Sequence, residues 1–346
     1  MKKLLLTVMI IALLAVPVQA SQIEAPAVPE AGEEYMPEDV DSFGEGLWYI
    51  IKKALSKLQP DLVAASGICV SLIAIVLFVS VLNGFSEKTK GMAGLAGSIA
   101  VGVLLISPSN TFIQLGVENV TQLSDYGKLL LPVMTSAMAA QGSLTGSAAL
   151  YTGTALFSSI LTTLITKLVV PMLYIYLCLC IANSVITEDI LKNMRDFVKW
   201  LMTWALKLVL YVFTGYIGIT GVVSGSADAA AVKAAKLTLS GTIPVVGGII
   251  SEASETILIG AGVVKNAVGI YGLLAIASVW IGPFLQIGIQ YLLLKLTGAV
   301  CGVLGSKQTT GLIQDFSGAM GIVLGMTGTV GLLLMISTVC FMKGLA

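Results

Sequence analysis

The sequence predicts an all-α fold, namely a polytopic helical membrane protein, and three observations lead to this prediction. Hydrophobic residues make up 56% of the 346 residues, and only 11% are charged, against about 25% in soluble domains. The mean hydropathy is +0.96. The apolar residues lie in long runs, several of which approach the roughly 20 residues that a helix needs to cross the hydrocarbon core. We expect seven to ten transmembrane helices.

The composition excludes most enzyme classes. The chain has 19 basic and 19 acidic residues and no histidine, so Ser-His-Asp triads, most zinc sites and haem ligation by histidine are excluded. No phosphate-binding glycine loop and no carboxylate pair framed for hydrolysis occurs. We expect no catalytic, cofactor or metal site, no nucleic-acid partner, and no enzymatic activity. Five cysteines lie in apolar runs and are expected to be buried free thiols: Cys69, Cys178, Cys180, Cys301 and Cys340.

Residues 1–20 have the features of a cleavable signal peptide. Lys2 and Lys3 precede an apolar stretch over residues 4–16, and small residues follow at Val18 and Ala20. Thirteen apolar residues are too few for a membrane span, so we expect cleavage after Ala20. The mature N-terminus would then lie outside the cytoplasm.

Two further segments precede the membrane domain. Residues 21–46 carry eight acids and no base, with several prolines and alanines, which predicts an acidic, disordered, extracytoplasmic leader. Residues 47–60 predict an interfacial amphipathic helix that ends at Pro60. Its apolar positions, next to Trp48, are Leu47, Ile51, Leu55 and Leu58. A plain juxtamembrane linker helix is the alternative interpretation.

Residues 61–346 form the predicted multi-spanning membrane domain, in contact with the lipid bilayer. The apolar runs cover residues 62–82, 92–106, 129–140, 148–165, 168–186, 200–223, 268–304 and 318–341, and the seventh is long enough for a pair of spans. The basic segment with Lys192, Arg195 and Lys199 should be cytoplasmic, which requires an odd number of spans before it. Runs 129–140 and 148–165 must therefore both cross or neither, and the sequence leaves this open.

Residues 239–263 are a more polar segment with helix-breaking residues. Pro244, Gly247 and Gly248 should interrupt a helix, and Glu252 and Glu255 share a face three residues apart. Such a segment at membrane depth would be re-entrant or line a wet cavity. Alternatively, the two acids occupy the first turns of a surface helix, where the helix dipole favours negative charge. The pair Lys265-Asn266 follows directly and would cap the next span.

Small residues recur at helical spacing near the end of the chain. Gly298 and Gly302 are four residues apart, as are Gly321 and Gly325, and Gly142-x3-Gly146 repeats the pattern. These positions predict close helix packing, either within the chain or at a subunit interface of a homo-oligomer. Gln286 and Gln290 share one helix face and are expected to form interhelical hydrogen bonds.

Nearly the whole chain, and most specifically the region of residues 215–270, resembles the stage III sporulation protein AE family of endospore-forming bacteria. The similarity is carried by residues 240–254, 257–262 and Lys265-Asn266, and by residues 221–225 with Asp228, Lys233 and Lys236. The resemblance implies a protein of the mother-cell membrane around the engulfed forespore. It also implies that the chain acts with the other proteins of its operon and a forespore partner. Together they would form a secretion-like channel needed for forespore development.

A stand-alone secondary transporter or permease with its site at residues 239–263 is the alternative function. An inverted repeat of the hydropathy pattern would favour a transporter. The sequence has no persuasive internal repeat, since the Pro244 to Gly248 motif occurs once.

Overall fold

The computed structural model describes residues 25–38, 42–85, 87–186, 189–242, 247–304 and 307–343. Within these ranges it places all side chains except those of residues 85, 87–90, 221–262, 264 and 304. The described elements are all helical, which confirms the all-α class. They are α2 (Glu30–Glu33), α3 (Phe43–Lys57), α4 (Gln59–Phe85), α5 (Glu87–Ala140), α6 (Leu144–Leu164), the π-helix η1 (Ile165–Val169), α7 (Val170–Val185), α8 (Asp189–Thr242), α9 (Gly247–Leu304) and α10 (Lys307–Lys343).

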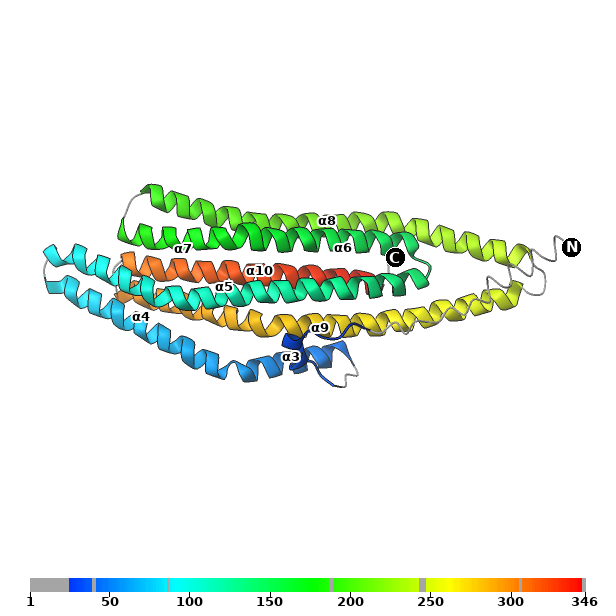
Figure 1. The fold of residues 1–346 in the computed structure, drawn as a ribbon, viewed down its shortest axis with the longest axis horizontal. Coiled ribbons are helices and arrows are strands. Elements are labelled where there is room, and N and C mark those ends of the chain that lie inside the picture. The colour runs from blue at the N-terminus through cyan, green and yellow to red at the C-terminus, as the bar shows by residue number, and fades with distance from the viewer. Residues whose placement is uncertain are drawn as a thin grey trace.

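The long helices form an elongated bundle around α10. They run nearly parallel to the long axis, and α10 lies in the middle of the bundle (Figure 1). It packs against α5, α6, α7, α8 and α9. Phe316, Met320 and Val323 are fully buried along its length. Helices satisfy every backbone polar group within the segment, so apolar runs of this length fold as helices in lipid.

Six helices among the described residues are long and apolar enough to cross a membrane. They cover Gln59–Gly84, Gly91–Ala140, Leu144–Val185, Asp189–Thr220, Lys265–Val303 and Lys307–Lys343. The number is lower than the expected seven to ten because neighbouring apolar runs are joined. Runs 92–106 and 129–140 both belong to α5, and run 268–304 belongs to the single helix α9. Runs 148–165 and 168–186 form one continuous helix through η1.

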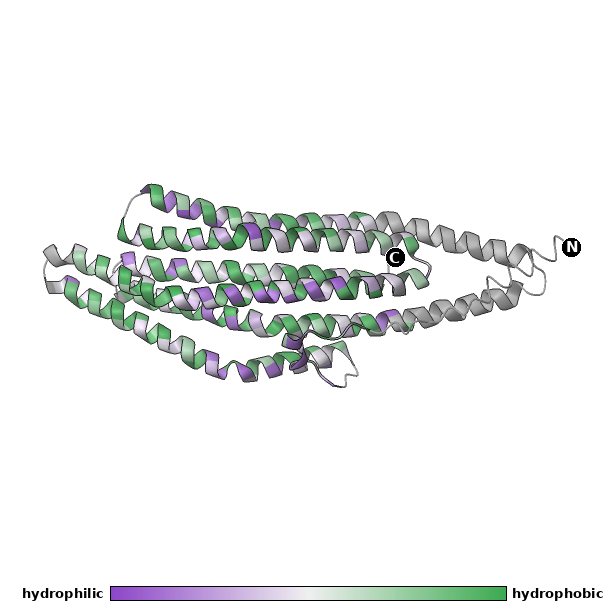
Figure 2. Ribbon diagram, in the orientation of Figure 1, coloured by the Kyte–Doolittle hydropathy of each residue, from purple (hydrophilic) through white to green (hydrophobic). Residues whose placement is uncertain are grey.

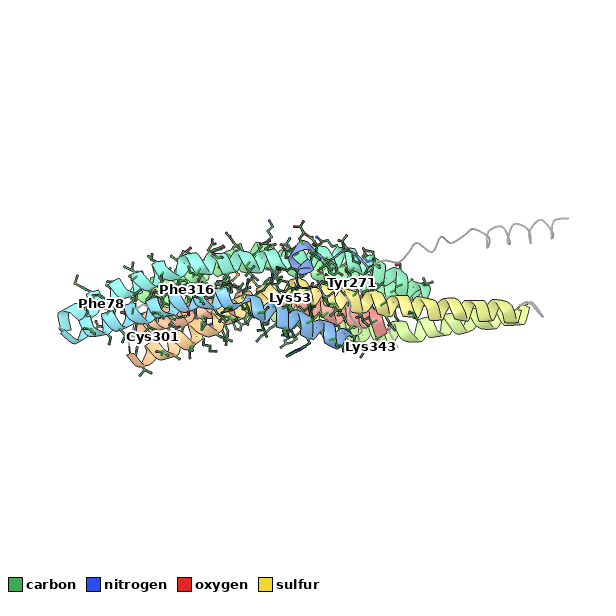
Figure 3. The ribbon with its side chains drawn as sticks, turned by 90° about the horizontal axis from the view of Figure 1, so that it is seen from below. Lys53, Phe78, Tyr271, Cys301, Phe316 and Lys343 are labelled. Atoms are coloured by element: carbon green, nitrogen blue, oxygen red, sulfur yellow. The ribbon has the colours of Figure 1, made fainter. Side chains whose placement is uncertain are left out.

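The joined helices settle the parity question within the described residues. Three candidate spans precede the segment with Lys192, which is an odd number. Runs 129–140 and 148–165 therefore make no crossings of their own. The C-terminal ends of α4, α7 and α9 lie at one end of the bundle, with Phe78 near that end, and the C-terminal ends of α5, α8 and α10 lie toward the opposite end (Figures 1 and 3).

The leader is ordered where the structure describes it, so the expectation of disorder is wrong for residues 25–38. Gly32 of α2 is buried against α9, where an added Cβ would lie 2.6 Å from Ser278 Oγ and 2.7 Å from Val279 Cγ2. Glu34 forms an ion pair with Lys57 of α3. The acidic stretch is therefore fixed by a close glycine contact and a basic partner. Residues 1–24, with the predicted signal peptide, lie outside the described residues.

Helix α3 corresponds to the predicted amphipathic helix, but the face that it buries differs from the predicted apolar face. It begins after Ser42, whose Oγ accepts a hydrogen bond from the Glu45 N–H at 3.3 Å. Ile50 and Ala54 are buried against Leu274, Ala277 and Ile281 of α9. The expected apolar face is split, because Trp48 (67% exposed) and Leu55 (52% exposed) point away from the bundle. The exposed side of α3 thus keeps apolar residues beside lysines, as in an interfacial helix.

Candidate functional site

A continuous stripe of polar side chains lies on the exposed face of α5, and we call it the polar seam. Its positions alternate by four and three residues, which places them on one side of a helix. All are exposed, and none is apolar. The seam consists of Ser107, Thr111, Gln114, Glu118, Thr121, Asp125 and Lys128. Figure 2 shows hydrophilic residues recurring along α5. The 21-residue separation of its ends corresponds to about 32 Å of helix.

The opposite face of α5 packs against the core, and this packing keeps the polar seam on the outside of the bundle. Ile113, Val120 and Leu123 are fully buried in the core. Close contacts fix α5 against α10, because a Cβ added at Gly116 would lie 2.6 Å from Val323 Cγ1. The Asn119 side chain also donates a hydrogen bond from Nδ2 to the Val279 carbonyl of α9, at 2.8 Å. Rotation of α5 about its axis would break these contacts, so the bundle cannot bury the seam.

The described hydrogen bonds of the seam are local to α5. Thr121 Oγ1 donates to the Val117 carbonyl at 2.9 Å, and Lys128 Nζ pairs with Asp125 Oδ1 at 2.7 Å. Glu118 Oε1 accepts from Gln122 Nε2 at 3.2 Å. These bonds leave three charged groups on the outer surface of the bundle. A charge at the centre of a lipid-facing helix costs roughly 2.5–3.5 kcal/mol even on the mildest scale, so this face needs water or a polar partner.

The seam lies at the same level as the apolar part of α8. Residues 189–199 of α8 include five charged residues, whereas residues 200–220 include only Lys207. The second stretch is 21 residues, or about 31 Å, close to the hydrocarbon thickness. Exposed Trp200 and Trp204 stack at its start, 6.0 Å between ring centroids, as aromatic residues do at a membrane interface.

Contacts through α10 establish this shared level. Arg195 of α8 pairs with Asp315 of α10, and Gly116 and Gly127 of α5 face Val323 and Leu334 of α10. Helices α5, α8 and α10 run in the same direction (Figure 1). The seam therefore extends across the layer that the apolar segment of α8 spans.

A partly buried ion pair joins α8 to α10 at one end of this layer. Arg195 Nη1 lies 2.7 Å from Asp315 Oδ2, and the two side chains are 14% and 16% exposed. Arg195 also contacts Asp196 at 2.8 Å. Tyr176 of α7 donates from its hydroxyl to the Asp315 carbonyl at 3.2 Å. This network ties three helices together, so Arg195 has a structural partner besides its expected role as a topogenic charge.

Comparisons with known proteins agree with this architecture. Residues 38–344 match the family described as stage III sporulation protein AE. The chain belongs to the stage III sporulation protein AE family. One relative, the stage III sporulation protein AE of Bacillus subtilis (strain 168), is 23% identical over 271 residues, which cover 76% of this chain and 67% of the relative. No solved structure matches the chain. Family membership implies a sporulation role, and the six apolar helices indicate a membrane location.

In this member of the stage III sporulation protein AE family, the 239–263 segment falls at the junction of two helices. Helix α8 ends at Thr242, and α9 begins at Gly247. Pro244 and the side chains of Glu252 and Glu255 lie outside the described residues, as do any contacts of Gly247 and Gly248. The pore-lining and first-turn interpretations therefore both stay predictions. Lys265 is buried and Asn266 exposed, and both lie within α9; their role in capping the next span stays a prediction.

The predicted packing glycines have different surroundings. Gly298 and Gly302 face α10, where added Cβ atoms would lie 3.0 Å from Gln314 Cγ and 3.6 Å from Thr310 Cγ2. Gly321 instead makes room for a side chain, since its Cβ would lie 3.2 Å from the Tyr291 ring. Gly325 has open space, with Leu206 at 3.9 Å. Gly142 has a φ of 92° in the turn after α5, so Gly142-x3-Gly146 is not a helix-packing ladder.

Two smaller expectations have mixed outcomes. Gln286 Nε2 donates to Asp61 Oδ2 of α4 at 2.9 Å, which is an interhelical hydrogen bond as predicted. Gln290 is buried, and its Oε1 has no hydrogen-bond partner among the described residues. All five cysteines are free, but Cys178 is exposed, so the expectation of burial is wrong there. No cluster of three potential metal ligands occurs within the described ranges.

The polar seam is the feature that hydropathy analysis misses. Its residues fall between two apolar runs, at 92–106 and 129–140, where low hydropathy suggests a connection between spans. The signal that could have identified it is the strict four-three spacing of polar residues from Ser107 to Lys128, combined with apolar residues such as Ile113 and Val120 on the other face.

Proposed function

We propose that this chain is a membrane subunit of a secretion-like channel complex that links the mother cell and the engulfed forespore during sporulation. It would lie in the mother-cell membrane around the forespore and would have no enzymatic activity. The observation that carries the proposal is the polar seam, which presents polar side chains over about 32 Å on the outside of a bundle of candidate spans.

The position of the seam favours an assembly over an isolated bundle. A surface that carries Glu118, Asp125 and Lys128 is poorly solvated by acyl chains. In a complex, the same surface would line a water-filled path or pack against polar surfaces of partner subunits. The candidates for those subunits are the other proteins of the same operon, a forespore partner and further copies of this chain.

A stand-alone transporter would place its polar path differently. Transporters hold their substrate and ion sites at the interface between two halves of their own helix bundle. Here the polar face of α5 points away from the helices that α5 packs against, α10 and α9. This geometry supports the channel subunit over the transporter.

The test converts part of the seam to an apolar surface. In the double variant Gln114→Leu, Thr121→Val, both side chains are exposed, and the hydrogen bond that Thr121 loses runs to Val117 of the same helix. We expect normal abundance in the membrane. Because the seam loses polar contacts worth about 1.4 kcal/mol, we expect about tenfold less co-purification of the operon partners, with a matching defect in sporulation after engulfment.

The matched control is Thr214→Val on α8. Thr214 is exposed in a candidate span, and its hydroxyl bonds to the Leu210 carbonyl four residues earlier, as that of Thr121 bonds to Val117. It should leave abundance, co-purification and sporulation unchanged. A double variant that sporulates and binds partners like the parent would refute the role of the seam. Purification of the parent without partners, together with substrate uptake into liposomes, would support the transporter instead.

A further inference from the structure

A groove between α8, α9 and α10 contains three lysine side chains above a floor of glycines. It comprises two adjoining cavities of about 390 and 350 Å³ that share Lys199, Tyr291 and Gly318. Lys295 borders the smaller cavity, and Lys207 borders the larger one. The groove is separate from the polar seam, because no residue of α5 lines it.

None of the three ammonium groups forms an ion pair among the described residues, although Lys199 interacts electrostatically with Asp315 at longer range. Lys295 Nζ contacts the Tyr291 hydroxyl at 2.9 Å and lies 5.2 Å from the centroid of the same ring, and neither contact neutralises it. Asp315 is the nearby acid on α10, but its carboxylate is paired with Arg195. The groove therefore concentrates uncompensated positive charge, which favours an anionic occupant.

The glycines of α10 leave the space in which these side chains lie. A Cβ added at Gly318 would lie 2.7 Å from Lys199 Nζ, and one at Gly321 would lie 3.2 Å from the Tyr291 ring. Larger residues at these positions would displace the lysine head group or fill the groove. The small residues thus have a role in shaping a cavity besides any role in helix approach.

The groove extends from the membrane interface toward the hydrocarbon layer. Lys199 is adjacent to Trp200, which is exposed and stacks on Trp204 at the start of the apolar part of α8. Lys295 is at a similar level, because its neighbour Gly298 faces Gln314 of α10, four residues before Gly318. Deeper in the groove, the walls are aliphatic, with Leu206 and Ile322. Lys207 is about 12 Å further along α8 than Lys199.

We propose that this groove binds the phosphate group of an anionic phospholipid. The phosphate would lie between Lys199, Lys295 and the Tyr291 hydroxyl, at headgroup level, and one acyl chain would extend along Leu206 and Ile322. Basic pockets between transmembrane helices are suited to phosphate-bearing headgroups. A zwitterionic lipid would leave the positive charge of the groove unbalanced, so a net negative headgroup is preferred.

The test measures thermal unfolding of the purified full-length chain in detergent with added lipid. Phosphatidylglycerol should raise the unfolding midpoint, and phosphatidylcholine should not. In the double variant Lys199→Gln, Lys295→Gln, the apparent affinity for phosphatidylglycerol should fall about 30-fold, since each lysine near an anionic headgroup contributes about 1 kcal/mol. Inorganic phosphate is the third arm. If it stabilises the parent as much as the lipid does, the occupant is a free anion and the lipid proposal is wrong.

Two further variants keep the test decisive. Lys167→Gln is the control, because it removes an exposed lysine from another candidate span. The hollow beside Lys167 is lined by residues of a single continuous helix. This variant should bind lipid like the parent. Gly318→Ala retains all charges but places a methyl group against Lys199 Nζ, so it should weaken lipid binding even if the double variant folds poorly. Equal lipid affinity in the parent, the double variant and Gly318→Ala would overturn the proposal.

Discussion

At the scale of single residues, the partly buried pair of Arg195 and Asp315 shows how this chain accommodates charge between its helices. Each side chain is about 15% exposed, and their nearest atoms are 2.7 Å apart. Charges removed from water are tolerated when each has a well-placed partner, and removal of one partner leaves the other uncompensated. Since the pair connects α8 to α10, its loss should loosen the central helix as well.

We therefore expect Arg195→Met, which leaves Asp315 without its partner, to lower the free energy of unfolding by about 3 kcal/mol. Asp315→Leu should cost less, because Arg195 keeps its contact with Asp196. The combined variant should recover most of that loss, because no lone charge remains buried. Thermal unfolding in detergent measures all three. Lys128→Met is the control, since it removes an exposed pair on α5 and should change the unfolding free energy by less than about 1 kcal/mol. Additive losses in the combined variant would contradict this account.

At the scale of helices, the glycines of α10 differ in how closely the methyl group of an alanine at the same position would approach neighbouring side chains. At Gly331 an added Cβ would lie 3.0 Å from Nε1 and 3.1 Å from Cδ1 of Trp280. The indole ring is large and rigid, and it packs at a tilt against Phe284, with 4.6 Å between ring centroids. At Gly325 the nearest atom would be 3.9 Å away. Substitution by alanine should thus destabilise the protein at Gly331 but not at Gly325.

Gly331→Ala should destabilise the protein by about 1–3 kcal/mol through overpacking against Trp280. Gly325→Ala should be neutral or stabilise by up to about 1 kcal/mol, because alanine is the better helix former. Membrane abundance and the thermal midpoint in detergent would separate the two variants. A loss at Gly325→Ala as large as that at Gly331→Ala would mean that α10 packs differently in this region.

Helix-scale features divide clearly into those the sequence predicts and those it does not. The apolar runs identify the helices correctly, but Pro108 and Pro132 lie inside α5 and do not end it, so the joining of runs was not predictable from local signals. The packing of residues 25–38 depends on a close contact between Gly32 and Ser278, which are distant in sequence. The lysine groove likewise requires three helices to meet, and spacing within one helix gives no sign of it.

At the scale of the whole molecule, six spans assign each turn to a side of the membrane. With residue 42 outside the cytoplasm and three spans before residue 189, the turn at Gln141 falls on the same side as Ser42. Had runs 129–140 and 148–165 crossed independently, Gln141 would be cytoplasmic. Its accessibility therefore distinguishes the joined helices from separate spans.

In a cysteine-free background, Ser42→Cys and Gln141→Cys should react with a membrane-impermeant maleimide in intact protoplasts. Asn193→Cys, at the basic end of α8, should react only after lysis because positive residues favour the cytoplasmic side. Mass-shift labelling of the purified chain gives the readout. Reaction of Gln141→Cys only after lysis would contradict the six-span arrangement.

The lengths of α8 and α9 have a mechanical consequence. Helix α8 continues to Thr242, 22 residues past Thr220, and α9 begins at Gly247, 18 residues before Lys265. These lengths correspond to about 33 and 27 Å, and the two helices extend past the other elements (Figure 1). These extensions of α8 and α9 would keep a second bilayer on this side about 30 Å from the ends of the shorter helices. The chain would then set the minimum distance between two apposed membranes.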